Sequence, residues 1–295
     1  MRGLQTHFNE RVDPVLLREL APMGVQMARM DMQHTDDAAL VQMVGETRET
    51  GMVPYVIVDH ASQINLLERG DHAEPRNEVD LEGPSPAEYR VLIDECAEVA
   101  RDRGVHLFAG AVSNFNARGF AYLRAICPLP EGVGASIHCY SAPGKGGGFS
   151  EAKVAEFRSI VGAKTDVIVS EGGYHTAPEP APWFRSQARD RGVQKSRLTQ
   201  VREAQLARQR GIQPLPDPAL ARGLFDRTVR RTDEQSTRYL REAMAFFEAH
   251  GFLGYVAYQL NDGVEDVPLS RYGIRRVDGR WKPQAEVFRV GLDLR

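Results

Sequence analysis

The amino-acid sequence predicts an α/β fold, a (β/α)8 or TIM barrel, and two observations favour it. Short strand-like runs alternate with helix-like runs, as parallel βα units do, and eight such units can be counted. Two glutamates near the ends of extended runs, Glu78 and Glu171, are 93 residues apart, which is three steps of about 31. Because about 250 residues form eight strand and helix pairs, each step matches one unit. The glutamates therefore fall on strands 4 and 7.

The first four units follow from strand-like runs and helix boundary signals. A continuous apolar run at 53–59 is typical of a strand buried on both faces. Gly51 suits the end of one helix, whereas Ser85, Pro86 and Glu88 form a capping box that starts another. We expect the strands at residues 3–8, 25–32, 53–59 and 73–79. We expect the helices at residues 13–21, 36–50, 63–69 and 86–102.

The last four units continue this alternation, and no interdomain linker interrupts it, so residues 1–295 are expected to form a single domain. The strands are expected at residues 105–111, 134–140, 166–170 and 254–259. The helices are expected at residues 117–126, 150–161 and 233–250, with a closing helix within 272–290.

A segment between strand 7 and its helix, residues 177–232, is longer than a βα connection requires. We interpret it as a helical insertion on the face where strands end. Residues 183–209 are permissive for a helix, three prolines at 214, 216 and 218 interrupt it, and 219–231 can form a second helix. The insertion contains twelve Lys/Arg against five Asp/Glu. It could dock on the barrel, cover a substrate cleft or contact an anionic partner.

Composition excludes several classes of protein. A net charge of -3 and a pI near 6.3 argue against a general nucleic-acid binder, and no apolar run is long enough to span a membrane. Three widely spaced cysteines indicate neither a disulfide framework nor a zinc knuckle. The N-terminus lacks the apolar segment of a secretion signal, so a cytoplasmic location is expected if the chain is full length. The oligomeric state stays open.

The strand ends carry an unusual number of polar side chains. Catalytic groups of TIM barrels lie at the C-terminal ends of the strands, so these residues are the candidate site. The glutamates are the candidate catalytic pair, because two carboxyl groups are what a glycosidase requires. The candidates for substrate binding and support are His7, Arg29, Asn77, His138, Tyr140 and Tyr258.

This ordered set resembles the clan A glycoside hydrolases, which are retaining enzymes built on (β/α)8 barrels. The resemblance covers most of the chain and implies that Glu78, preceded by Asn77, is the general acid/base and that Asn77 reaches the sugar 2-hydroxyl. It further implies that Glu171 is the nucleophile and that Arg29 supports it. His138 and Tyr140 match a His-x-Tyr pattern on strand 6. Strand 8 carries Tyr258 where many members have a tryptophan that stacks on the sugar.

The two glutamates need different protonation states for this chemistry. Glu171 is expected to be ionised, because Arg29 and donors such as Tyr140 favour a carboxylate. Glu78 is expected to carry a proton in the resting enzyme, beside the negative Glu171. No cofactor is required. The substrate class is an oligosaccharide or polysaccharide, whose sugar, linkage and endo or exo cleavage the sequence leaves open.

Two other functions remain open. A metal-dependent hydrolase or isomerase would bind a divalent ion through rim residues, although no closely spaced ligand pair such as HxH supports it. A carbohydrate-binding barrel without catalysis would use the basic insertion as its main contact. The rim residues considered for the metal site are His7, Asp31, His60, His138 and His175.

Overall fold

The structure, a computed structural model, is a closed barrel of eight parallel strands in the order β1 to β8. It describes residues 1–6, 14–31, 37–81, 83–113, 115–141, 148–174, 218–259, 273–276 and 279–289, with only the backbone for 14–16, 31, 141 and 218–232. β1 pairs with β2 on one side and with β8 on the other, which closes the barrel. The predicted (β/α)8 fold is therefore confirmed.

The eight strands lie close to their predicted positions. They are β1 (Arg2–Gln5), β2 (Met27–Asp31), β3 (Val53–Val58), β4 (His72–Pro75), β5 (His106–Val112), β6 (Gly134–Ser141), β7 (Val167–Tyr174) and β8 (Gly254–Ala257).

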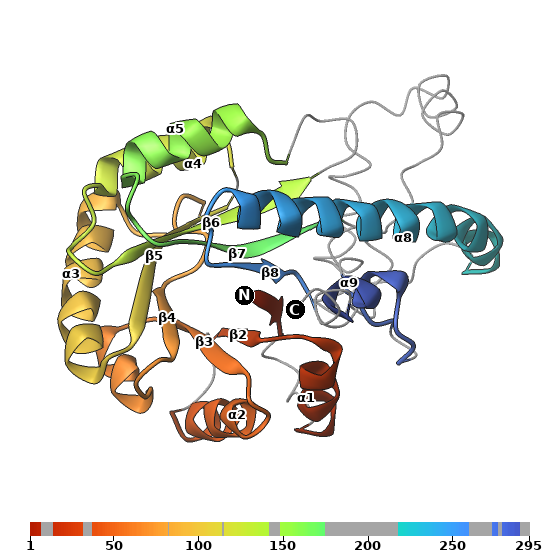
Figure 1. Ribbon diagram of the computed structural model, residues 1–295, viewed down its shortest axis with the longest axis horizontal. Coiled ribbons are helices and arrows are strands. Elements are labelled where there is room, and N and C mark those ends of the chain that lie inside the picture. The colour runs from red at the N-terminus through yellow and green to blue at the C-terminus, as the bar shows by residue number, and fades with distance from the viewer. Residues whose placement is uncertain are drawn as a thin grey trace.

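Helices connect the strands and lie outside the barrel, as Figure 1 shows for α1 to α5. Ser85 caps α3 with the predicted capping box, since its side chain accepts a hydrogen bond from the Glu88 amide while the Glu88 carboxylate accepts one from the Ser85 amide. The α-helices are α1 (Pro14–Leu20), α2 (Asp37–Glu49), α3 (Pro86–Arg103), α4 (Ala117–Ile126), α5 (Glu151–Val161), α8 (Pro218–Ala249) and α9 (Glu286–Arg289). The short 3-10 helices of the described residues are η1 (Ala21–Met23), η2 (Ala61–Leu66) and η4 (Pro283–Ala285).

Helix α8 corrects the prediction for the segment before strand 8. Separate helices at 219–231 and 233–250 were expected, but one helix of 32 residues runs through both. Pro218 begins it, at a position where proline is tolerated. Asp233, the first residue of the second expected helix, lies inside α8, and its buried carboxylate binds Arg276 of the C-terminal segment. Figure 1 shows α8 extending beyond the barrel. Residues 177–217 of the expected insertion lie outside the described residues.

Four smaller boundaries also differ from the predictions. The helix expected at 63–69 is the 3-10 helix η2, and the closing helix expected within 272–290 is confined to η4 and α9. β4 ends at Pro75 rather than at residue 79, because Arg76 and Glu78 have φ of 60° and 45°, which no strand contains. β7 continues to Tyr174 rather than ending at residue 170.

The barrel interior is layered along its axis. Met27, Tyr55 and Phe108 belong to an apolar layer near the N-terminal ends of the strands, together with Ile168 and Val256. Side chains two positions apart point to the same face of a strand, so Arg29 follows Met27 into the next interior layer. A separate and larger apolar cluster packs the strands against the helices. The interior thus becomes polar toward the C-terminal ends of the strands.

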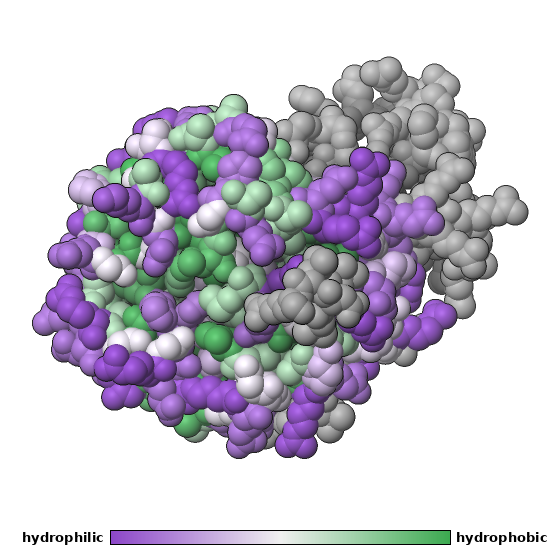
Figure 2. All heavy atoms as spheres, in the orientation of Figure 1, coloured by the Kyte–Doolittle hydropathy of each residue, from purple (hydrophilic) through white to green (hydrophobic). Residues whose placement is uncertain are grey.

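One face of the molecule has hydrophilic residues around its edge (Figure 2). Figure 2 shows hydrophilic residues around most of the outline of this face, with hydrophobic ones between them. Among the described residues, no helix is long and apolar enough to cross a membrane. The large apolar side chains that are most exposed come from different elements and are Met1, Val41, Leu81, Val91 and Leu253.

Candidate active site

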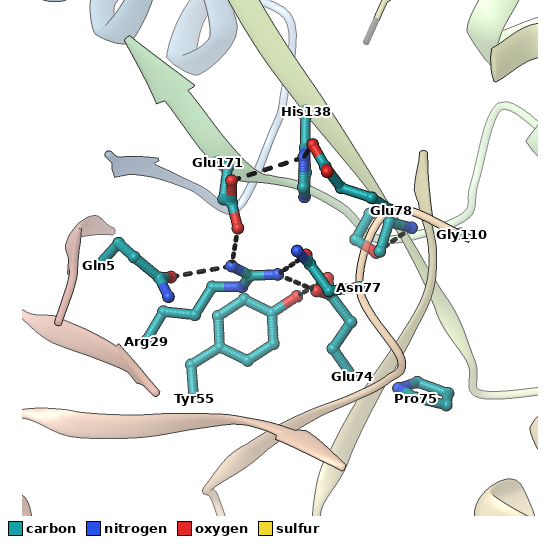
Figure 3. Close-up of polar contacts among 12 residues, drawn as sticks. Gln5, Arg29, Tyr55, Glu74, Pro75, Asn77, Glu78, Gly110, His138 and Glu171 are labelled. Carbon is teal, nitrogen blue, oxygen red and sulfur yellow. Dashed lines mark hydrogen bonds and ion pairs between the residues drawn. The ribbon is translucent and has the colours of Figure 1, made fainter. Parts of the chain in front are cut away.

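Arg29 of β2 is the centre of the polar layer, and its side chain is fully buried. One terminal nitrogen, Nη1, donates to Gln5 Oε1 at 2.8 Å and to Glu171 Oε1. The other, Nη2, donates to Asn77 Oδ1 at 2.8 Å and to Glu74 Oε1. Figure 3 shows these four partners around one guanidinium. Arg29 therefore joins the loop that carries Asn77 and Glu78 to the strand that carries Glu171.

Glu171 faces the interior because β7 contains a bulge. Ile137 and His138 are consecutive in β6, yet they pair with Val169 and Glu171, so Ser170 is an extra residue in β7. An extra residue reverses which face the following side chains occupy, and bulges are common beside active sites. Without the bulge, the alternation from Ile168 would turn Glu171 away from Arg29.

The carboxylate of Glu171 is buried and ionised. Burial opposes its charge, but His138, Arg29 and the hydroxyl of Tyr140 outweigh burial and hold the pKa of Glu171 below its usual value. Tyr140 donates to Glu171 Oε2 at 2.5 Å. The pKa of Tyr140 is raised well above 10 by burial and by Glu171, so this hydroxyl keeps its proton as a donor. The environment therefore favours the charged form of Glu171.

Glu78 occupies the loop after β4 in a left-handed backbone conformation. Its carbonyl accepts a hydrogen bond from the Leu81 amide at 2.8 Å, and the Arg76 amide donates to the Val58 carbonyl at 2.9 Å. These bonds fix a tight turn just past the strand. The Glu78 side chain is 38% exposed, against 6% for Glu171. One carboxyl group is therefore open to incoming molecules, whereas the other is enclosed below it.

His138 of β6 lies between the two carboxyl groups (Figure 3). Its Nδ1 is 3.6 Å from Glu78 Oε1 and 3.6 Å from Glu171 Oε2. Burial alone would lower the pKa of His138, but the two nearby carboxylates raise it above its ordinary value. The nitrogen of His138 and the oxygens of Glu78 and Glu171 all lie within 4.8 Å of one another.

A cavity of about 680 Å³ opens beside Glu78. Asn77 and Pro84 line it, as does the ion pair in which Arg76 Nη1 is 2.6 Å from Asp59 Oδ1. This volume is within the range of sites for small molecules. The exposed carboxyl group of Glu78 thus borders a space that a ligand can enter.

The structure brings together six of the eight predicted site residues, Glu78, Glu171, Arg29, Asn77, His138 and Tyr140. Tyr258 follows β8 and stands edge-on to Tyr140, with ring centroids 5.8 Å apart, so it borders the same group. His7 lies outside the described residues. The arrangement of the predicted strand ends is therefore compatible with one site.

Three residues that contact Arg29 or its partner Glu74 were not among the predicted site residues. Glu74 is fully buried and binds Arg29, and the hydroxyl of Tyr55 donates to Glu74 Oε2 at 2.6 Å. Gln5 binds Arg29 from β1. Only the residues at strand ends were considered, although the alternation of β4 places Glu74 in the interior two positions after His72. That alternation was the available signal.

Two of the five rim residues considered for a metal site, His60 and His138, have described side chains. His60 is exposed at the start of η2. The side chain of Asp31 and all of His7 and His175 lie outside the described residues. Within the described part of the chain, the group of three metal-binding side chains is Glu78, His138 and Glu171.

Comparisons with known proteins rest on structure alone, because no family model and no curated protein sequence matches the chain. A family 39 glycoside hydrolase from Bacteroides cellulosilyticus WH2 superposes with a TM-score of 0.59 at 15% identity, over 99% of this chain and 63% of that one. An exo-β-1,4-mannosidase from Opitutaceae bacterium strain TAV5 gives 0.55 at 12%, over 98% and 58%. A family 10 endoxylanase from a sugarcane soil metagenome gives 0.56 at 10%, over 99% and 96%.

The solved structures share the fold implied by the resemblance to clan A glycoside hydrolases, and that expectation is confirmed at the level of the barrel. The chain spans less than two thirds of the length of the first two.

Proposed function

We propose that the protein is a retaining β-glycoside hydrolase, with Glu171 as nucleophile and Glu78 as general acid/base. One observation carries the proposal: an enclosed, ionised carboxylate on β7 and an exposed carboxyl group after β4 have oxygens within 4.8 Å of each other. Retaining enzymes hold their two carboxyl groups about 5 to 5.5 Å apart, whereas inverting enzymes need about 6.5 to 9.5 Å to admit a water. The separation supports the retaining mechanism.

In the first step, an oxygen of Glu171 attacks the anomeric carbon of the bound sugar. The bond from that carbon to the leaving oxygen breaks, and the carboxylic acid of Glu78 gives its proton to that oxygen. The products are a glycosyl ester on Glu171 and a free alcohol. Glu78 is placed for this transfer because it borders the cavity where the leaving group would sit.

In the second step, Glu78, now a carboxylate, removes a proton from water. The water oxygen bonds to the anomeric carbon, and the ester bond to Glu171 breaks. Glu78 is a stronger base at this stage because the charge of Glu171 is consumed by the ester. Two displacements return the anomeric configuration to that of the substrate.

The neighbouring residues position this pair. Arg29 and Tyr140 orient the nucleophile through Oε1 and Oε2 respectively. Asn77 accepts a hydrogen bond from Arg29 through Oδ1, which directs its amide nitrogen away from Arg29 as a donor for a sugar hydroxyl. Tyr258 offers an aromatic face to the substrate. Solved structures with this fold that act on β-linked mannosides and β-1,3-glucans support an oligosaccharide or polysaccharide substrate.

The decisive experiment measures hydrolysis of aryl β-glycosides and β-linked oligosaccharides by the wild type and two variants. Glu171→Gln should abolish the reaction, with a loss beyond about 10⁴-fold in kcat. Glu78→Gln should lose about 10² to 10⁴-fold with a poor leaving group and much less with a good one that needs no proton. Glu88→Gln is the control, because its exposed carboxylate lines the same cavity and glutamine can replace it in the capping box.

Proton NMR of the first product should show retained anomeric configuration. Wild-type rates in both Glu171→Gln and Glu78→Gln would contradict the assignment of residues. An inverted product would contradict the double displacement even if both variants were inactive.

A further inference from the structure

The side chain of His138 is fully buried in the site, and neither of its ring nitrogens makes a hydrogen bond. Its contacts with the two carboxylates are 3.6 Å long, so the solvation lost by the ring nitrogens is not replaced by hydrogen bonds. Its Nδ1 nevertheless points at two carboxylate oxygens. The ring is therefore placed where a third atom could bind all three groups.

The spacing of these groups suits a small cation. Ligand atoms about 2.1 Å from a tetrahedral zinc ion lie about 3.4 Å from one another. His138 Nδ1 is 3.6 Å from Glu78 Oε1 and 3.6 Å from Glu171 Oε2. Small rotations of the partly exposed Glu78 side chain would bring the remaining pair of oxygens from within 4.8 Å to this separation.

The geometry points to a divalent transition-metal site made by Glu78, His138 and Glu171, with zinc as the ion that fits it best. One imidazole nitrogen and two carboxylate oxygens are ligands that zinc accepts in tetrahedral sites, with the fourth position left for water or substrate. Arg29 contacts Oε1 of Glu171 and leaves Oε2 facing His138. Tyr140 also donates to Oε2, which has a second lone pair for the metal.

Binding of the ion would inhibit hydrolysis, and only this consequence rests on the proposed function. The metal would occupy the space between the two carboxyl groups, where the glycosidic bond has to lie. It would also bind the oxygens that must attack the sugar and donate the proton. Zinc is therefore inferred to be a reversible inhibitor that competes with the substrate.

The protein is first treated with a chelator, and the chelator is then removed. Titration calorimetry with zinc chloride then tests the site without any substrate. The wild type should bind one zinc ion. Glu78→Gln should bind it at least about tenfold more weakly, since it loses one ligand. This residue is in an exposed loop, so a thermal melt can verify that the variant folds. His250→Gln is the matched control, because His250 and Glu151 form an exposed pair 2.6 Å apart that could bind metal unspecifically.

Cobalt gives a second readout, because it replaces zinc and absorbs visible light in a tetrahedral site. The visible bands should appear in the wild type and in His250→Gln but not in Glu78→Gln. Magnesium should bind far more weakly than zinc, since it prefers six oxygen ligands. Equal zinc affinity in wild type and Glu78→Gln, or loss of binding in His250→Gln, would overturn the site.

Activity measurements separate this inference from the proposed function. Zinc should inhibit hydrolysis with an inhibition constant equal to the measured dissociation constant, and chelator should restore the full rate. Binding that raises the rate would overturn the inhibitory role and the metal-free mechanism together. If no glycoside is cleaved but zinc binds as expected, the proposed function fails while the metal site stands.

Discussion

Arg29 contacts two buried carboxylates, and one positive charge cannot neutralise both. Glu74 and Glu171 lie on opposite sides of its guanidinium, and burial of such a cluster is costly unless the charges balance. On its other side, Glu171 Oε2 lies 3.6 Å from His138 Nδ1, and the two nearby carboxylates raise the pKa of His138. Glu74 shares the charge of Arg29, so the guanidinium orients Glu171, the proposed nucleophile, more than it neutralises it.

We expect Glu74→Gln to lower kcat by up to about 10²-fold while KM changes little, because a small displacement of Arg29 misplaces Glu171. Glu74 lies below Arg29 and does not line the cavity, so substrate binding is spared. Tyr55→Phe is the control, because it removes one hydrogen bond to Glu74, worth about 1 kcal/mol of stability, and keeps the charge. Steady-state kinetics below the melting temperature of each variant would measure both. A rise in KM with kcat unchanged would contradict a positioning role.

At the scale of elements, β7 contains a bulge that its sequence pattern did not predict. A short apolar run predicted the strand, but not that Ser170 is an extra residue, because a bulge depends on the register with β6 and β8. The turn after β4 was missed for a similar reason, since a left-handed Glu78 is stabilised by contacts with β3 and Leu81 rather than by its own type. Both elements that carry the catalytic pair are irregular where it sits.

Gly172, next to the bulge, should not tolerate a side chain. A Cβ there would lie 2.2 Å from the buried Tyr255 hydroxyl and 2.9 Å from the Cys139 carbonyl oxygen. We expect Gly172→Ala to cost about 1–3 kcal/mol or more in the free energy of unfolding, measured by urea denaturation, and to reduce activity by moving Glu171. Addition of Tyr255→Phe should recover part of the loss, because the closest atom is removed.

Gly45→Ala, a substitution within helix α2, is the control for Gly172→Ala. A Cβ added at Gly45 would have nothing within 4 Å. Alanine is about 1 kcal/mol better than glycine inside a helix, so this variant should gain stability. A Gly172→Ala protein as stable as the wild type would show that Tyr255 and β6 move aside freely.

At the scale of the whole molecule, the barrel was predictable because eight βα units repeat along the chain, and parallel strands joined by helices have few other ways to close. The same topology brought Arg29, Asn77 and Glu171 together from distant segments, since all C-terminal strand ends share one face. The length of α8 was not predictable from local signals, because its buried Asp233 pairs with Arg276, which is distant in the sequence. The extent of α8 therefore depends on a contact between distant segments, which local sequence signals do not reveal.

The opposite end of the barrel should control its stability in acid. His72 is buried there among aromatic rings, with its centroid 5.8 Å from that of Tyr55 and 5.3 Å from that of Phe108. Burial, and then the neighbouring His106, lower the pKa of His72 from 6.5 to about 4. Between these two pH values the unfolded chain binds a proton that the folded protein does not. The free energy of unfolding should therefore fall as the pH decreases from 6.5 to 4, by about 3 kcal/mol from this residue.

His72→Phe should remove that dependence, because phenylalanine fits the aromatic layer and Nδ1 of His72 has no hydrogen bond to lose. Urea denaturation at pH 7, 5.5 and 4 should show the variant gaining on the wild type as the pH falls. His106→Gln should give a smaller gain, since it removes only the second cause of the lowered pKa and leaves burial unchanged. Parallel loss of stability in the wild type and His72→Phe would place the acid-sensitive group elsewhere. The contribution is large for a domain, whose total stability is about 5–15 kcal/mol.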